Sequence, residues 1–408
     1  MTADTETTAA STLDLLAADF RVNSEAVREA AERHWYAETT LGPAVLRYED
    51  CAAILRDRRF RQGGADHLAD QGITDGPLAE MWRDVILNIH EGDRHNRLRR
   101  LVSQAFTPNA VDELRPRMRR IVHDLVDTFA PAGACEFMGA FADHYPPQVM
   151  FDLLGIPEED HPQFLEWGKT LGLTLSYSVA EHVDAIEAAL SGLYAATDRL
   201  CASRRRRPGD DLISRLVAAA DQGDRLTDQE LRSMVAAFVI GGQDTTRNQL
   251  GLAMVLFARH PDQWALLACR PELAAQATEE VIRVAPAVPI VWRAAAEDVV
   301  WRDLSIPAGT RLWILVGAAH TDEATFGPDA RRFDISVADR PSQLAFGHGV
   351  HYCLGAALAR AEIAEALPIL ASRLPGLELT NSPEFRPDIS GFTGPNSLPI
   401  RFETSPGS

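Results

Sequence analysis

A cysteine near the C-terminal end of the sequence lies in a setting that could support chemistry. Cys353 stands in the stretch FGHGVHYCLG, residues 346–355, and a helical pattern of apolar residues begins directly after it. At the start of a helix, the helix dipole and free backbone N–H groups favour a thiolate over a thiol. Glycines would let the backbone approach a flat cofactor closely. The stretch therefore predicts a metal or cofactor ligand, although a single cysteine is more often a small buried apolar residue.

Two kinds of metal centre fit this stretch. Zinc could use His348, His351 and Cys353, but the sequence offers no complementary ligand pair at structural-zinc spacing. The whole pattern, Phe-Gly-x-Gly-x-His-x-Cys-x-Gly, resembles the haem-binding signature of the cytochrome P450 family at every fixed position. The resemblance implies that Cys353 is the thiolate ligand of the iron of haem b, an arrangement that favours O–O cleavage. It also implies that Phe346 lies near the sulfur, His351 near a haem carboxylate and Gly355 against the cofactor.

A second stretch, VIGGQDTTR at residues 239–247, interrupts a long apolar helical pattern. Glycine costs about 1 kcal/mol in a helix interior and threonine hydroxyls can bond back to backbone carbonyls, so the helix is expected to open here. A simple helix kink would explain the stretch equally well. Its position resembles the family's oxygen-binding groove, which implies that Asp244 and Thr245 deliver protons to iron-bound dioxygen. Gly241 stands where the family often has alanine and leaves more room.

Two further motifs are expected to have a structural role around the site. Glu280 and Arg283 share one helical face, which alone would be a weak exposed ion pair. Their position resembles the family's Glu-x-x-Arg, which implies a buried structural network completed by Arg332 from an irregular stretch at 325–342. The tetrapeptide AHTD at 319–322 departs from the Ala-Asn-Arg-Asp that is common in bacterial members, so the contacts there are left open.

Basic residues near position 95 form another pattern. A basic run on a helix is usually a solvated face. His95 and Arg99 nevertheless stand four residues apart and match the family's His-x-x-x-Arg, which implies that they bind the haem carboxylates. Arg293 matches the family arginine that pairs with a haem carboxylate. Arg97 and Arg100 are expected to point elsewhere and to remain available to a partner.

Composition limits the possible functions. The 408 residues are 46% hydrophobic and 24% charged, as in globular proteins with a substantial core. A formal net charge of -18 argues against a nucleic-acid partner. The sequence has no signal-peptide pattern and no apolar run of the roughly 18 to 20 residues needed for a membrane span, which predicts a cytoplasmic protein. Five cysteines without a repeated spacing argue against a disulfide framework.

Apolar periodicity predicts a mainly α protein. Helical spacing covers residues 23–34, 110–130, 183–204, 227–260, 272–284 and 356–373. Strand-like segments are short and lie at 44–48, 311–316 and 398–402. The resemblance implies the cytochrome P450 fold, a helical prism with a small β-rich lobe. We expect one domain over 1–408, with 1–20 as a flexible N-terminal segment.

The resemblance implies a haem-thiolate monooxygenase of bacterial secondary or xenobiotic metabolism, which hydroxylates or epoxidises a small apolar organic substrate. A peroxide-dependent haem-thiolate enzyme and a non-catalytic haem sensor or binding protein remain open, although the Asp-Thr pair argues against the first. Expected partners are a ferredoxin and a ferredoxin reductase as electron donors. The substrate could be free or tethered to a carrier protein, and the chain is expected to be a monomer.

The same resemblance places the substrate pocket in parts of residues 62–82, 171–179, 236–242, 288–292 and 391–393. Side chains there are mostly aliphatic or small, which favours an apolar substrate. The candidate lining residues are Trp82, Ala237, Gly241, Val288, Ile290, Val291 and Phe392.

Overall fold

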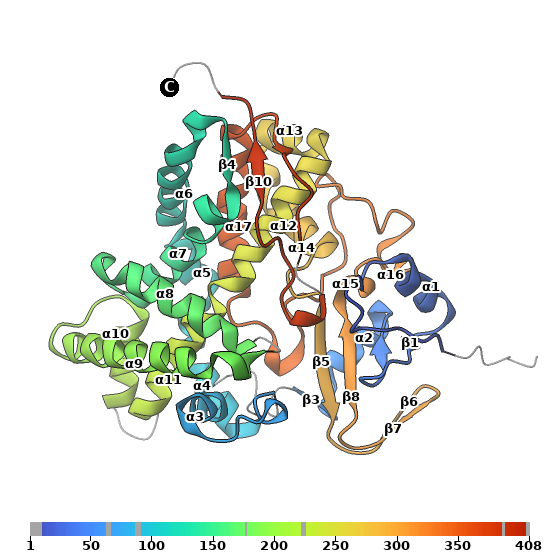
Figure 1. Ribbon diagram of the computed structural model, residues 1–408, viewed down its shortest axis with the longest axis horizontal. Helices are drawn as coiled ribbons and strands as arrows, with labels where there is room; N and C mark the ends of the chain where they lie inside the picture. Colours follow the sequence, from blue (N-terminus) through green and yellow to red (C-terminus); the bar gives the residue numbers. More distant parts are fainter. Residues whose placement is uncertain are drawn as a thin grey trace, which may run out of the picture.

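The computed structural model describes residues 10–404 except for five short internal segments, which are 63–66, 86–90, 176–177, 222–225 and 386–387. Helices make up most of the described chain, and its strands form three small sheets. A helix-rich lobe lies beside a smaller lobe that holds the largest sheet (Figure 1). The mainly α architecture with a small β-rich lobe is as predicted. None of the described helices is long and apolar enough to cross a membrane.

The helix-rich lobe packs around one large cluster of buried apolar side chains. Each helix turns its apolar stripe toward this cluster, as the spacing in the sequence predicts. Its main helices are α3 (Gly76–Val85), α4 (Gly92–Ser103), α5 (Pro108–Asp112), α6 (Arg115–Phe129), α7 (Tyr145–Leu154), α8 (His161–Gly172), α9 (Val183–Arg206), α10 (Leu212–Asp221), α11 (Asp228–Gly241), α12 (Asp244–Arg259), α13 (Pro261–Cys269), α14 (Ala274–Val284) and α17 (Ala356–Arg373).

The helical pattern at 227–260 forms two helices. Thr227 caps the start of α11 by accepting a hydrogen bond from the Glu230 N–H, while the Glu230 side chain bonds back to the Thr227 N–H. The first helix ends at Gly241 and α12 begins at Asp244. The predicted opening of the helix at the glycine pair is confirmed.

The largest sheet has the strand order β1-β2-β8-β5-β3. Antiparallel pairing of β3 with β5 sets Gln62 directly opposite Arg293. This register places the arginine expected at the cofactor next to the edge strand β3. The strands are β1 (Tyr36–Ala37), β2 (Ala44–Val45), β3 (Phe60–Gln62), β5 (Ile290–Ala295) and β8 (Arg311–Leu315).

Short elements complete the fold. The sheet-bearing lobe also holds four helices, namely α1 (Glu25–Arg33), α2 (Tyr48–Arg56), α15 (Val316–Ala319) and α16 (Glu323–Phe326), as Figure 1 shows. The two smaller sheets are antiparallel, with strands β6 (Val299–Trp301) and β7 (Leu304–Ile306) in one and β4 (Ala134–Glu136), β9 (Glu378–Leu379) and β10 (Pro399–Arg401) in the other.

Part of the N-terminal segment predicted as flexible is packed in the structure. Residues 1–9 lie outside the described chain, but Leu13, Leu15 and Phe20 are buried in the apolar cluster of the sheet-bearing lobe. Thr12 forms a parallel bridge with Glu38. The prediction is therefore wrong for residues 10–20, because three of their apolar side chains are buried against the sheet-bearing lobe.

Two adjacent leucines test this packing. Leu15 is 1% exposed and Leu16 is 57% exposed. We expect Leu15→Ala to lower the free energy of unfolding by about 2–5 kcal/mol, the usual cost of a core leucine. Leu16→Ala should stay within about 0.5 kcal/mol of the parent. Urea unfolding of both variants is the measurement, and equal effects would show that this segment is not packed.

Candidate active site

Hydrogen bonds and glycine conformations shape the loop before α17. The Cys353 N–H donates to the Phe346 carbonyl over 2.8 Å, which closes the loop. Gly347 and Gly349 both have φ near +70°, where a side chain is strained. A Cβ on Gly349 would also lie 3.1 Å from the carbonyl oxygen of Leu55 in α2. The glycines are therefore needed for the backbone path that presents the cysteine.

Part of the surface of Cys353 is exposed, but many protein atoms lie close to its sulfur. Burial raises the pKa of its thiol, and the Gly355 N–H with the charges of Arg99 and Arg360 only partly offsets this effect. Burial of the thiol therefore opposes the thiolate that the position before a helix favours. A bound metal cation would deprotonate the sulfur.

Cationic side chains from three separate segments converge next to the cysteine loop. His95 of α4 is buried, and its ring lies 4.7 Å from the ring of His351. One helical turn later, the Arg99 guanidinium donates to the Tyr352 carbonyl over 2.6 Å. Arg293 of β5 is also buried, and among the described residues it has no carboxylate within ion-pair distance. The structure thus brings together the four residues that the sequence assigned to carboxylate binding.

Several buried polar atoms in this region lack a partner. His95 Nε2, His351 Nδ1 and Gln62 Oε1 have no hydrogen bond to any described residue. Buried polar atoms are normally paired, so each of these is unusual. Burial also lowers the pKa of Arg293 to about 10, because its charge has little compensation. The unpaired imidazole nitrogens of His95 and His351 can donate hydrogen bonds, and together with the buried guanidinium they fit a cofactor with carboxylate groups.

Glu91 is a site residue that sequence reasoning missed. Its carboxylate lies 2.9 Å from His351 Nε2 and accepts the Gln62 N–H over 3.2 Å. Burial alone would raise the pKa of Glu91, but these two contacts outweigh it and lower that pKa. Glu91 stands four residues before His95, the same spacing as that between His95 and Arg99, and this spacing was the signal in the sequence.

The opening between α11 and α12 separates two adjacent side chains. The Thr245 hydroxyl donates back to the Gly241 carbonyl over 3.1 Å, as the sequence predicts. The Asp244 carboxylate instead lies toward α8, where a Cβ on Gly172 would be 2.7 Å from its Oδ2. A Cβ on Gly241 would meet nothing within 4 Å, so the expected extra room is present.

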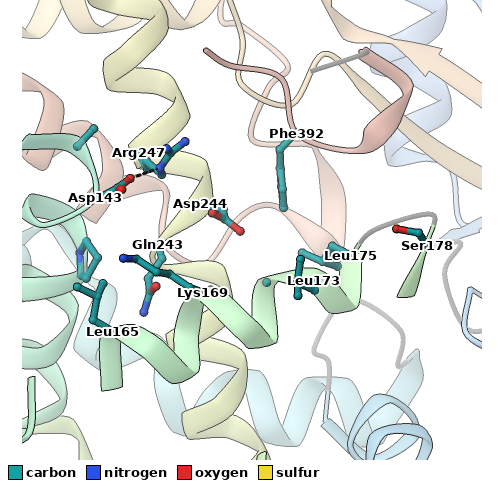
Figure 2. A pocket seen from close by; sticks show the side chains of 13 residues that line it. Asp143, Leu165, Lys169, Leu173, Leu175, Ser178, Gln243, Asp244, Arg247 and Phe392 are labelled. Carbon is teal, nitrogen blue, oxygen red and sulfur yellow. Dashed lines mark hydrogen bonds and ion pairs between the residues drawn. The ribbon is translucent and has the colours of Figure 1, made fainter. Parts of the chain in front are cut away.

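Asp244 lines a cavity of about 680 Å³ between α7, α8, α12 and the segment around Phe392 (Figure 2). Leu165, Leu173 and other apolar side chains make up much of its wall. Arg247, which is ion-paired with Asp143, also lines it. The Asp244 carboxylate, at the start of α12, therefore faces this cavity.

The other residues predicted to line the substrate pocket lie in several different parts of the structure. Ile290 packs in the same buried cluster as the N-terminal leucines, and the alternation of strand β5 turns it away from Arg293. Ile290 therefore faces away from Arg293, whereas Val291 shares the face of Arg293, and the lining role of both stays a prediction. Trp82 is buried in the core of the helix-rich lobe, while Val288 and Ala237 are half-buried. Of the predicted pocket segments, 63–66 and 176–177 lie outside the described residues.

The Glu-x-x-Arg pair is buried as the resemblance implied. Arg283 binds both carboxylate oxygens of Glu280, at 2.7 and 2.8 Å. The third member is Arg340, whose Nε lies 3.1 Å from Glu280 Oε2. Arg332, which the sequence assigned to this position, is 65% exposed and pairs with Asp334. That assignment is wrong because a turn in the irregular stretch leaves only the Arg332 carbonyl facing the network.

Sequence reasoning also missed a buried acid that contacts helix α12 next to the break after Gly241. Glu362 of α17 forms a hydrogen bond with Thr246 of α12, and burial raises its pKa to about 8. Tyr145 donates to the Glu362 carbonyl over 3.0 Å. The sequence signal was an acidic residue on the apolar face of a helix, aligned with the buried Leu358 and Ala366. The neutral acid joins the two long helices of the core.

Fold and site together define a haem-thiolate protein. The family model of cytochrome P450 matches residues 270–374. The chain is 39% identical to the luteothin monooxygenase of Streptomyces thioluteus, covering 96% of this chain and 95% of the relative. It is 40% identical to the mycinamicin IV hydroxylase/epoxidase of Micromonospora griseorubida over 82% of each chain. The crystal structure of CalO2 superposes with a TM-score of 0.86 at 31% identity, covering 95% and 99% of the two chains. The chain belongs to the cytochrome P450 family of haem-thiolate monooxygenases.

Arg293 offers a test of the cofactor site. Arg293→Met should speed the loss of haem to excess apomyoglobin by about tenfold or more, because a hydrogen bond to a charged group contributes about 1.5–3 kcal/mol. Arg311→Met is the matched control, since Arg311 lies on the neighbouring strand and pairs with Asp70 near the surface. Equal rates of haem loss in the two variants would exclude Arg293 from the site.

Proposed function

We propose that this cytochrome P450 hydroxylates or epoxidises an apolar secondary metabolite, with Cys353 as the iron ligand. The observation that carries the proposal is the convergence of the Cys353 loop with unpaired, buried carboxylate-binding groups. The luteothin monooxygenase and the mycinamicin IV hydroxylase/epoxidase, to which the chain is similar, support this proposal. Half-buried apolar side chains on the Arg293 side of strand β5 and at Phe392 also suit an apolar ligand.

Each group of residues has a proposed task. Haem, when bound, supplies the binding and reduction of dioxygen, and the Cys353 thiolate donates electron density to the iron. His95, Arg99, Arg293 and His351 would hold the haem carboxylates, which fixes the cofactor against the cysteine loop. Buried apolar walls keep water from the substrate.

Proton delivery is assigned to the opening in the oxygen-groove helix. Asp244 lies in the cavity beside α8, where it can exchange a proton with water. Thr245 presents its hydroxyl at the break between α11 and α12, where the Gly241 carbonyl orients it. The two side chains would pass protons inward in that order. Peroxide-driven chemistry would need neither side chain.

The proposed reaction is tested with the purified holoenzyme, a surrogate ferredoxin and reductase, NADPH and ¹⁸O₂. A panel of polyketide-derived and terpenoid compounds is screened first for the change in haem spin state that substrate binding causes. Binders should then yield a product that carries one ¹⁸O atom. Product formed with hydrogen peroxide but not with the electron-transfer system would contradict the proposal, and so would binding without any turnover.

Thr245→Ala isolates the proton-delivery step. The variant should bind haem and substrate normally, but product formed per NADPH should fall by about tenfold or more because general acid catalysis is lost. Thr278→Ala is the control, since that buried hydroxyl makes a similar back-bond to Ala274 in α14, outside the proposed groove. Unchanged coupling in Thr245→Ala would remove Thr245 from the mechanism.

The electron donor is proposed to dock around the cysteine loop. Val350 and Tyr352 of this loop are exposed apolar side chains, at 46% and 36%. Arg100, which follows the Tyr352-bonded Arg99 on α4, is exposed and could attract an acidic ferredoxin. Arg97 was predicted to share this task, but it is ion-paired with Glu230 of α11. That part of the prediction is wrong because a distant helix supplies a carboxylate.

Arg100→Glu should slow reduction by an acidic ferredoxin about two- to tenfold at low salt and flatten the salt dependence, because such steering is screened over about 8 Å at physiological salt. Arg33→Glu on α1 is an equally exposed control in the sheet-bearing lobe. Stopped-flow reduction across a salt series is the measurement. A rate for Arg100→Glu equal to the parent at low salt would place the docking surface elsewhere.

A further inference from the structure

We propose that His320 is a positioning residue for the haem ligand, because its imidazole ties the end of helix α14 to the start of the cysteine loop. The inference rests on the proposed ligation of iron by Cys353. It concerns the tetrapeptide AHTD, whose contacts the sequence left open. The histidine follows α15 directly and is fully buried.

Both ring nitrogens of His320 form hydrogen bonds with the backbone, one with an acceptor and the other with a donor. Nδ1 lies 2.9 Å from the Arg283 carbonyl oxygen, which can only accept a hydrogen bond. Nε2 lies 2.7 Å from the Leu344 backbone nitrogen, which can only donate one. Only the neutral tautomer with its hydrogen on Nδ1 satisfies both partners. The ring therefore acts as a rigid connector between α14 and residue 344.

Leu344 is the point where the cysteine loop begins. Its carbonyl accepts the Gly347 N–H over 2.8 Å, which forms the first turn of the loop. The loop is then closed by the bond from the Cys353 N–H to the Phe346 carbonyl. A displaced Leu344 would move that turn, so the sulfur position depends on the imidazole.

The surroundings keep the imidazole neutral. Burial lowers the pKa of His320 to about 3, and the Arg283 charge acts in the same direction, while the bond to the Arg283 carbonyl opposes both. The Arg283 guanidinium is the charged group next to the ring, and it donates to the His320 carbonyl over 3.0 Å while pairing with Glu280. Phe326 covers another side, with its ring centroid 6.3 Å away. Asp322 is occupied by the backbone of Tyr48.

The lowered pKa gives a direction to the pH dependence. The folded protein keeps His320 neutral, whereas the unfolded chain takes up a proton below the ordinary pKa of about 6.5. The stability that His320 contributes is therefore complete above about pH 6.5 and is lost progressively as the pH falls toward 3. A side chain that accepts the Leu344 N–H without titrating would remove this dependence.

Three variants of the holoenzyme test the proposal. His320→Leu removes the acceptor for the Leu344 N–H, and His320→Gln supplies an uncharged amide oxygen that can replace it. His260→Leu is the matched control, because His260 bonds the Leu256 carbonyl and packs on Phe333 without contacting the cysteine loop. The measurements are hydrogen exchange at the Leu344 and Gly347 amides and the carbon monoxide spectrum of ferrous haem between pH 8 and 5.

His320→Leu should exchange the Leu344 amide about tenfold faster and convert part of the thiolate spectrum to the thiol-type spectrum, because one buried hydrogen bond is lost. His320→Gln should restore both and lose its thiolate spectrum at a lower pH than the parent. His260→Leu should lower stability without either local change. Unchanged exchange and spectrum in His320→Leu would overturn the proposal.

If His320→Leu does not fold, the comparison of His320→Gln with the parent still tests whether His320 positions the cysteine loop. Acid loss of the thiolate spectrum at the same pH in both proteins would overturn the positioning assignment. The proposed function fails separately, if Cys353→Ser keeps the thiolate-type spectrum. Exchange at Leu344 would still report on His320 in that case, because it does not depend on which residue binds iron.

Discussion

The fully buried guanidinium of Arg283 is the constraint on which the frame of the site depends. A buried charge is costly unless it is paired and all its donors are bonded. Arg283 makes five hydrogen bonds, two to Glu280 and one each to the carbonyls of His320, Ala330 and Arg332. These bonds fasten α14 to two irregular segments that have little regular structure of their own. The chain that leads to the cysteine loop is thereby held in place.

The haem site follows a different rule, since its polar groups are left unpaired inside the protein. His95, His351 and Arg293 are drawn together by tertiary packing although each carries or can carry positive charge. Such an arrangement is unfavourable without an anion, so the bound cofactor would contribute to the stability of the fold itself. The carboxylate of Glu91 supplies part of the compensation.

Glycines mark the places where the backbone must come close to something else. Gly349 lets the cysteine loop pass the carbonyl of Leu55, and Gly172 leaves room for the carboxylate of Asp244. The break after Gly241 frees a carbonyl that the Thr245 hydroxyl then binds. At each of these positions the backbone of one segment comes into close contact with a residue of another helix or loop. The loops and helix breaks therefore shape the active site more than the regular helices do.

The sequence by itself determined the fold class, the haem-ligand loop, the helix opening at 242–243 and the buried Glu280–Arg283 pair. The mainly α class and the helix opening rest on near neighbours in the chain, whose spacing and turn chemistry are local, whereas the haem-ligand loop and the burial of the Glu280–Arg283 pair were implied by the resemblance of their motifs to the cytochrome P450 family. Only the tertiary structure decided that Arg340 and not Arg332 completes the network, that Arg97 is paired with Glu230, and that Ile290 packs in the apolar cluster of the N-terminal leucines. The chain offers many arginines that are equivalent in sequence. Which one meets a given carboxylate depends on distances between segments far apart in the chain, and these distances exist only once the core has packed.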